Sequence, residues 1–315
     1  MQIPGGGGRL TIPLARRWGM GIGAGRGVRE RGSMTDYVLT LRCSNRSGIV
    51  AAVATRIAAH GGDIFEAQQF DDPETGMFFM RVAFAMDGSV QAFRAALGED
   101  ERTFGLDVRL RPAGLRRKVL LLVSRFDHCL GDLLYRCRIG ELHMEPVGII
   151  GNHPRDALNL TLMEGIPYHY LPVTPQTKAA QEARVKAIFE ETGAELAVLA
   201  RYMQVLSDDM SAYLAGRCIN IHHSFLPGFK GAKPYHQAHA RGVKMIGATA
   251  HYVTADLDEG PIICQDTEAA SHADTAEDMV RKGRDIERRV LARAVSWHLE
   301  DRVLINKGKT VVFAR

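Results

Sequence analysis

The sequence lacks an apolar run near the ~18 residues that a membrane-spanning helix needs. Its five cysteines are scattered without C-x-x-C spacing, which argues against a disulfide framework and against a cysteine-based zinc site. The H-E-x-x-H pattern of many zinc hydrolases is also missing. A chain of 315 residues that is 46% hydrophobic and 24% charged therefore predicts a globular protein of a reducing, cytoplasmic compartment, long enough for two domains.

The basic excess of the chain is confined to residues 1–33. The net charge is +4, but this segment contributes +5, from six arginines against Glu30, and the remainder is nearly neutral. A basic balance that belongs to a tail does not predict a nucleic-acid-binding surface. The segment is rich in glycine, without the strand and helix that flank a nucleotide loop. We expect a disordered extension, with a transit peptide or sequence upstream of a start at Met34 as alternatives.

Residues 34–111 predict a small domain with the element order βαββαβ. Strands are expected at 37–41, 64–70, 77–84 and 106–110, and helices at 48–60 and 90–97. Between the second and third strands, Asp72-Pro73-Glu74-Thr75-Gly76 is a hairpin signal. This order within about 75 residues predicts a ferredoxin-like sheet.

Residues 112–118 predict a linker, and residues 119–315 predict a second, α/β domain. Residues 119–123 are a continuous apolar run, typical of a parallel strand buried on both faces. Further strands are expected at 147–150, 196–199, 246–253 and 262–264, and a short one ending at 219–220; helices are expected at 177–191 and 275–300, and a hairpin at 303–313. This alternation predicts a doubly wound, Rossmann-like sheet.

Two polar segments follow strands of the second domain. Asn220 and His222 come just past one expected strand, and Asp256 and Asp258 lie in a loop after another. In open α/β sheets, ligands bind beyond the carboxyl ends of the strands. We therefore expect an amide, an imidazole and a carboxylate to face one crevice, although spacing alone does not decide between the two aspartates.

The residues Asn220-Ile221-His222 and Leu257-Asp258-Glu259-Gly260 resemble the catalytic set of the folate-dependent formyltransferases. Residues 220–261, with 128–133, 148–153 and 200–206, are similar to the formyltetrahydrofolate deformylases within that fold. The resemblance covers residues 37–315 and implies that Asn220, His222 and Asp258 are catalytic. It also implies a pterin site, formed by Met203, Gln204, Val205, Leu206, Val253 and Asp256.

The activity implied by this resemblance is hydrolysis of 10-formyltetrahydrofolate to formate and tetrahydrofolate, without a cofactor or a metal. Asp258 would activate the water, and Asn220 and His222 would stabilise the tetrahedral oxyanion, for which one donor is typically worth ~3–4 kcal/mol.

Three alternatives compete with this activity. The first is a transferase that passes the formyl group to an amine, although residues 124–129 lack the Gly- and Ser-rich phosphate-holding turn of glycinamide ribonucleotide transformylases, and Asp127 would repel a phosphate. The second is a metal hydrolase that uses His222, His236, His239 or Asp258. The third is an amino-acid sensor that only binds folate.

The loop Asn45-Arg46-Ser47-Gly48 resembles the Asp-Arg-Pro-Gly loop of the amino-acid-sensing ACT family. The resemblance implies an amino-acid effector and a homo-oligomer that pairs copies of this sheet. Asn45 and Ser47 depart from the family pattern. A purely structural interpretation therefore stays open, in which Gly48 makes the turn and Asn45 caps the helix.

Overall fold

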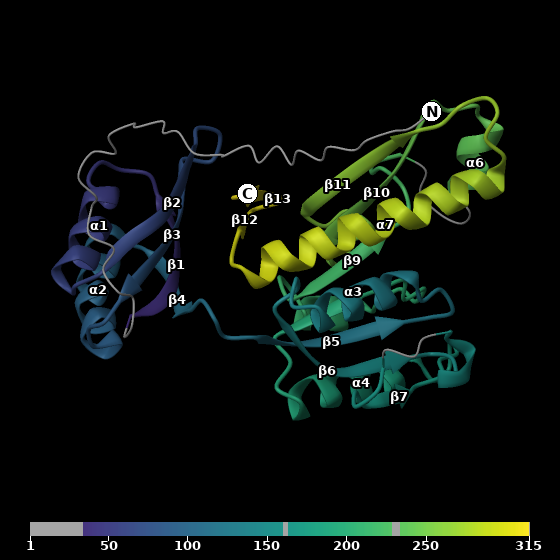
Figure 1. Ribbon diagram of the computed structural model, residues 1–315, viewed down its shortest axis with the longest axis horizontal. Coiled ribbons are helices and arrows are strands. Elements are labelled where there is room, and N and C mark those ends of the chain that lie inside the picture. The colour runs from purple at the N-terminus through teal and green to yellow at the C-terminus, as the bar shows by residue number, and fades with distance from the viewer. Residues whose placement is uncertain (1–33, 160–162, 229–233, 315) are drawn as a thin grey trace, which may run out of the picture. The chain divides into compact units, whose positions relative to one another are not determined.

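The computed structural model describes residues 34–159, 163–228 and 234–314 (Figure 1). The extension expected at residues 1–33 lies outside these described residues. Within them, no helix is both long and apolar enough to cross a membrane.

The first part of the described chain is a four-stranded antiparallel sheet in the order β2-β3-β1-β4, which confirms the expected order of elements. Its elements are β1 (Thr35–Ser44), α1 (Ile49–Ala59), β2 (Asp63–Asp72), β3 (Met77–Met86), α2 (Val90–Phe104) and β4 (Asp107–Pro112). Apolar residues of both helices, among them Val53, Ile57, Phe93 and Leu97, form one core with the strands. The helix expected at 90–97 continues to Phe104.

The turn into α1 is made by glycine rather than by a capping side chain. Gly48 is the N-cap residue, with φ 96° in the left-handed region that favours glycine, and no side chain caps the helix. The predicted Asn45 cap is wrong, because Asn45 lies three residues earlier, where its backbone N–H donates to the Gly76 carbonyl at 2.8 Å.

The second part is a mixed seven-stranded sheet in the order β11-β10-β9-β8-β5-β6-β7. Its elements are β5 (Arg117–Val123), α3 (His128–Arg138), β6 (Met144–Gly151), the 3-10 turn η1 (Arg155–Ala157), β7 (Tyr168–Tyr170), α4 (Lys178–Glu191), β8 (Leu196–Leu199), α5 (Asp208–Tyr213), β9 (Cys218–His222), α6 (Pro234–Ala240), β10 (Met245–Tyr252), β11 (Ile262–Ala269), α7 (Ala276–Leu299), β12 (Val303–Asn306) and β13 (Lys309–Val312). Strands β5 to β9 pair in parallel, whereas β10 and β11 are antiparallel additions at one edge. The Rossmann-like prediction is confirmed.

The connection between the two sheets is shorter than the expected linker of 112–118. Strand β4 ends at Pro112 and β5 begins at Arg117, so only residues 113–116 lie between them. The side chains of Arg117 and Lys118 point to Glu195 and to the Thr192 carbonyl at the rim of the second sheet. Because β5 begins with the charged residues Arg117 and Lys118, which lack the apolar pattern of a buried strand, the sequence pattern did not predict its first two residues.

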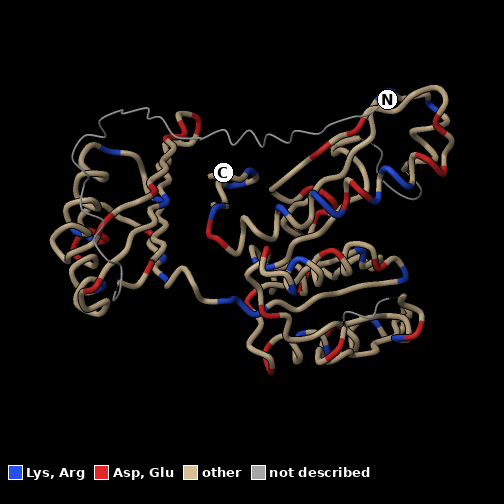
Figure 2. The backbone as a smooth tube through the Cα atoms, in the orientation of Figure 1, with Lys and Arg blue, Asp and Glu red and all other residues tan. Residues whose placement is uncertain are grey.

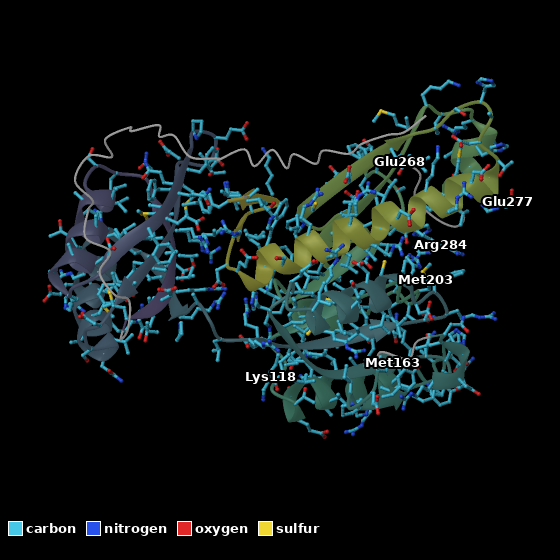
Figure 3. The ribbon with its side chains drawn as sticks, in the orientation of Figure 1. Lys118, Met163, Met203, Glu268, Glu277 and Arg284 are labelled. Atoms are coloured by element: carbon cyan, nitrogen blue, oxygen red, sulfur yellow. The ribbon has the colours of Figure 1, made fainter. Side chains whose placement is uncertain are left out.

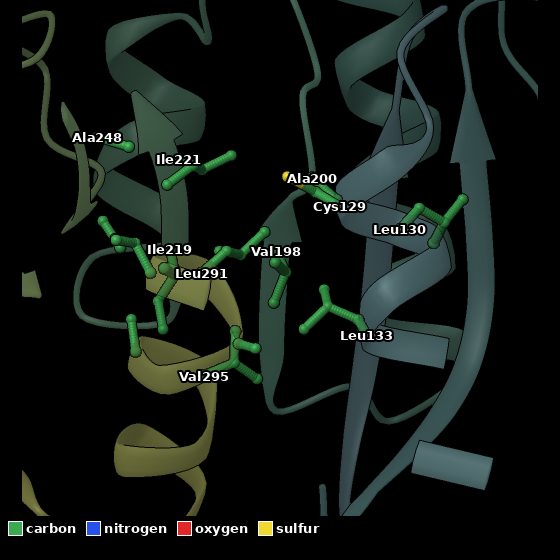
Figure 4. Packing of buried hydrophobic residues seen from close by; sticks show 14 of the residues in the cluster. Cys129, Leu130, Leu133, Val198, Ala200, Ile219, Ile221, Ala248, Leu291 and Val295 are labelled. Atoms are coloured by element: carbon green, nitrogen blue, oxygen red, sulfur yellow. The ribbon is translucent and has the colours of Figure 1, made fainter. Parts of the chain in front are cut away.

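Strand β5 is buried on both faces, as its apolar run predicts. Val119, Leu121 and Val123 join the core that contains α3 and α7, whereas Leu120 and Leu122 join the core that contains α4. Figure 4 shows Leu291 and Val295 of α7 beside Ile219 of β9 and Val198 of β8, with Leu133 of α3 nearby. This packing fixes the strands whose carboxyl ends carry the polar segments.

Helix α7 begins as its sequence predicts. The Thr275 hydroxyl accepts from the Asp278 N–H at 3.1 Å, and the Asp278 carboxylate accepts from the Thr275 N–H at 3.1 Å, which is a capping box. Acidic and basic residues both occur along the helix (Figure 2), while its other face, including Ile286, Val290 and Leu291, lies in the core. The helix therefore serves as the amphipathic cover of β9, β10 and β11.

The C-terminal segment is tied to the first sheet by a buried cation. Arg302 is fully buried and donates to Glu66 at 2.8 Å, to Glu300 at 2.7 Å and to the Phe313 carbonyl at 3.0 Å. Nearby, the exposed Lys309 pairs with Glu74 at 2.7 Å. These two ion pairs differ in burial but join the same two segments.

We expect Arg302→Met to lower the free energy of unfolding by about 3–5 kcal/mol, because it leaves buried acceptors without their donor. Lys309→Met is the matched control, and loss of its exposed ion pair should lower the free energy of unfolding far less. Urea denaturation of both variants measures the difference. Equal losses would contradict a special role for the buried pair.

Candidate active site

Strand β9 presents Asn220 and His222 on one face. Because side chains alternate along a strand, Ile219 and Ile221 enter the core while the two polar residues share the opposite face. The strand expected to end at 219–220 continues to His222, so both polar residues belong to β9. Pairing with β10 brings Asn220 opposite His251.

The loop after β10 carries Asp258 back toward β9. Asp258 has φ 59°, in the left-handed region that few residues other than glycine, asparagine and aspartate adopt. Gly260 is needed for the return, because a Cβ there would lie 1.7 Å from the Tyr252 carbonyl oxygen. The Leu-Asp-x-Gly pattern thus supplies the backbone conformation of the loop as well as the carboxylate.

The three predicted side chains converge. The His222 Nδ1 lies 3.2 Å from the Asp258 Oδ2, and the Asn220 Nδ2 lies 3.2 Å from the His251 Nε2, which is 3.6 Å from the Asp258 Oδ1. The His222 and Asp258 side chains are only 6% and 11% exposed. Asp256, the other candidate base, is exposed on the loop.

Asp258 is held as a carboxylate. Burial alone would raise its pKa, but hydrogen bonds and charge from His222 and His251 outweigh burial and place the pKa well below its usual range. A carboxylate that binds protons so weakly is suited to accept a hydrogen bond and to balance a neighbouring positive charge. It is less suited to remove a proton from water by itself.

The trio lines a cavity of about 210 Å³ that also contains every predicted pterin contact. Those contacts are Met203, Gln204, Val205, Leu206, Val253 and Asp256. Met203, labelled in Figure 3, is 50% exposed, and its backbone N–H donates to the Ser124 hydroxyl at 2.9 Å. The His222 Nε2 is buried and has no hydrogen-bond partner among the described residues. The Nε2 of His222 therefore has hydrogen-bonding capacity that none of the described residues uses.

Comparison with known proteins now identifies the chain's family. Residues 117–295 match the formyl transferase family. The formyltetrahydrofolate deformylase of Corynebacterium sp. is 49% identical over 279 residues, which are 88% of this chain and 97% of that protein. The crystal structure of the formyltetrahydrofolate deformylase from Burkholderia mallei is 50% identical, with a TM-score of 0.85 over 89% of this chain and 100% of that one. The chain belongs to the formyltetrahydrofolate deformylase family.

Glycinamide ribonucleotide transformylases share a smaller part of this deformylase-family chain. The enzyme from Symbiobacterium toebii is 28% identical, with a TM-score of 0.58 over 63% of this chain and 95% of that one. The Corynebacterium match spans 279 residues, more than the second sheet region contains, so it includes the first sheet as well. The likeness to the deformylases is therefore broader.

His251, to which its sequence pattern assigns no catalytic role, also lies in the site. The His251 Nδ1 lies 2.9 Å from the Tyr252 carbonyl oxygen and its Nε2 faces Asn220 and Asp258. Its side chain is 3% exposed. A buried histidine at the end of a strand, in the segment that leads to Asp258, was the available signal.

His236 and His239, candidates for a metal site, lie exposed on α6 and do not line the cavity. Among the described residues, the donor atoms of His128, Cys129 and Glu287 lie within 4.8 Å of one another. Glu287 already accepts from His128 and Tyr235 at 2.8 Å each, and Arg201 lies 3.3 Å away. We interpret this cluster as a hydrogen-bonded network beside the cavity.

His223 should make this deformylase-family protein less stable in acid. Burial and the nearby charge of Arg201 lower the pKa of His223 from 6.5 to about 4. The unfolded chain therefore binds a proton as the pH falls below about 6.5, whereas the folded chain binds it only near pH 4, so stability is lost across this window. We expect this one residue to cost up to roughly 3 kcal/mol between pH 7 and pH 4.5.

Urea denaturation at the two pH values checks the expectation. His223→Asn should lose less stability than the unmodified protein on acidification. An unchanged difference between the two pH values would contradict the assignment. His239→Asn is the control, because His239 is an exposed residue of α6.

Proposed function

We propose that the protein hydrolyses 10-formyltetrahydrofolate to formate and tetrahydrofolate. The observation that carries the proposal is the convergence of Asn220, His222 and Asp258 in one cavity, with the His222 Nδ1 3.2 Å from the Asp258 Oδ2. Membership of the deformylase family supports the substrate, since relatives of that name cover almost the whole chain.

The proposed chemistry begins with a water beside the formyl carbon. With its Nδ1–H donated to Asp258, His222 keeps an Nε2 lone pair that no described residue uses, and we assign this lone pair to the reacting water. That nitrogen removes a proton as the water oxygen bonds to the formyl carbon. Asp258 thus activates water through His222, and its negative charge balances the imidazolium that forms, as in other carboxylate–imidazole pairs.

The tetrahedral intermediate carries an oxyanion, which Asn220 is placed to stabilise. One amide N–H faces His251, and the second remains available for the oxyanion. The imidazolium of His222 adds positive charge at the same centre. Its proton then passes to N10 as the C–N bond breaks, giving tetrahydrofolate, and the formic acid released ionises to formate.

The loop after β5 supports water rather than an amine nucleotide as the acceptor. The Ser124 N–H donates to the Arg201 carbonyl at 3.2 Å, and the Asp127 carboxylate accepts from the Asn159 N–H at 2.7 Å. These groups are engaged within the protein, and Asp127 adds negative charge where a phosphate would need donors.

Incubation of the purified protein with 10-formyltetrahydrofolate, without an amine, tests the proposal. Formate and tetrahydrofolate should appear in equal amounts, and glycinamide ribonucleotide should not raise the rate. Formylation of that amine at a higher rate than hydrolysis would establish the transferase instead. Retention of activity after exhaustive chelation would set aside the metal hydrolase.

The first sheet suggests finer roles, which are also proposals. Its βαββαβ order and the Asn45–Gly48 loop are compatible with an ACT-like module that binds an amino-acid effector. The exposed Phe65 and Phe70 on the edge strand β2 favour a homo-oligomer. Light scattering tests the oligomer, and assays with single amino acids test the effector. We place the protein in the cytoplasm on its free cysteines.

A further inference from the structure

Arg201 occupies an unusual position beside the catalytic trio. Strands β8 and β9 are parallel, with Leu199 opposite Asn220. Arg201 and His222 each follow two residues later, at the carboxyl ends of neighbouring strands, and both line the same cavity. Arg201 is 9% exposed and has φ 66°, a left-handed conformation that an arginine rarely adopts.

The guanidinium of Arg201 has unused donors. Its Nε and Nη1 are buried and make no hydrogen bond to any described residue. Its described ion-pair partner is Glu287, 3.3 Å from the Nε, and that carboxylate already accepts from His128 and Tyr235. A buried guanidinium whose N–H groups lack hydrogen bonds is costly, unless a ligand supplies the acceptors.

The charge of the cavity points to the kind of ligand. Of its described lining residues, Arg201 is the one lysine or arginine, whereas Asp256 and Asp258 are acidic. Hydrolysis of a formamide adds a second anion, formate, next to the Asp258 carboxylate. Two carboxylates at close range repel each other strongly unless a cation lies between or beside them.

We propose that the Arg201 guanidinium is the subsite that receives the carboxylate of formate as it forms. The inference rests on the proposed hydrolysis and adds a specificity-determining residue to it. Guanidinium N–H pairs match the two oxygens of a carboxylate. A fixed positive charge at this point also disfavours a protonated amine as the alternative acceptor.

Inhibition of hydrolysis by added sodium formate tests the subsite. We expect Arg201→Gln to raise the inhibition constant of formate about tenfold or more, with a smaller change in KM for the folate. Arg284→Gln is the matched control, because Arg284 lies over the same Phe126 ring but is exposed on α7 and does not line the cavity (Figure 3). For this control variant, the inhibition constant of formate should stay within about twofold of the value for the unmodified protein.

Glu287→Gln should change the inhibition constant of formate in the opposite direction, to a lower value. Removal of the carboxylate that compensates Arg201 should tighten formate inhibition by about threefold, a change that a merely structural role would not produce. A folded Arg201→Gln protein with unchanged inhibition overturns the proposal. If that variant does not fold, the unmodified protein decides: formate must inhibit more than sodium chloride at equal ionic strength, or the subsite does not exist.

Binding of ¹³C-formate, followed by NMR line broadening, separates this proposal from the proposed function. If the unmodified protein broadens the formate signal more than Arg201→Gln does, but releases no formate from the folate, then the subsite exists and the proposed hydrolysis is wrong. A protein that hydrolyses the folate but broadens the signal equally with and without Arg201 lacks the subsite.

Discussion

Asp258→Asn should reduce kcat by about 10²–10⁴-fold while folate binding is retained. The carboxylate accepts from His222 and holds a charge that its low pKa maintains across the working pH range. An amide has the same shape but no negative charge to balance an imidazolium, and it can turn its NH₂ group toward His222. Single-turnover rates and folate titration, measured separately, give the two quantities.

This substitution is favourable for a clean test because asparagine tolerates the left-handed backbone at position 258. Asp256→Asn is the control, since it removes a carboxylate from the same loop at an exposed position. We expect the control to keep kcat within about threefold. Activity lost in Asp256→Asn and kept in Asp258→Asn would reverse the assignment of the two aspartates.

The low pKa of Asp258 also predicts the shape of the pH–rate profile. A carboxylate whose pKa is lowered stays ionised as the pH falls, so its protonation should not cause an acid limb near neutrality. Any loss of kcat between pH 7 and pH 5 should therefore arise from another group. An acid limb that disappears only in Asp258→Asn would contradict this.

The sequence predicted those elements whose burial produces a clear pattern of apolar and turn-forming residues. The apolar run at 119–123 and the hairpin at 72–76 correspond to β5 and to the β2–β3 turn. Strand β7 (Tyr168–Tyr170) was missed because three residues show no period. The segment of α3 was singled out only for the family resemblance of residues 128–133, and that of α6 only for His236 and His239. The predicted start of a strand was wrong where charged residues begin it, as Arg117 begins β5.

The sequence predicted that Asn220, His222 and Asp258 come together, but not which residues surround them. Alternation along β9 places Asn220 and His222 on one face, which the Asn-x-His spacing already contains. The choice of Asp258 over Asp256 depends on a left-handed φ and on Gly260, which spacing does not reveal. Arg201 and Glu287 are distant in the sequence and meet only because α7 packs across the sheet.

Substitution of His222 should have an effect as large as that of Asp258. His222→Gln removes the group proposed to accept the proton of water and to return it to N10, so kcat should fall by about 10²–10⁴-fold. His223→Gln is the matched control, because His223 is adjacent and lines the same cavity, yet its pKa of about 4 leaves it neutral at the working pH. The control should lose less than about tenfold.

The double variant His222→Gln/Asp258→Asn distinguishes a cooperating pair from two independent residues. If Asp258 acts through His222, the carboxylate cannot contribute to kcat once the imidazole is removed. The double variant should then be about as slow as the slower single variant. Losses that multiply, to roughly 10⁴-fold or beyond, would mean that Asp258 deprotonates water directly. The pair of kcat ratios, measured at one pH under single-turnover conditions, decides between the two routes for the proton.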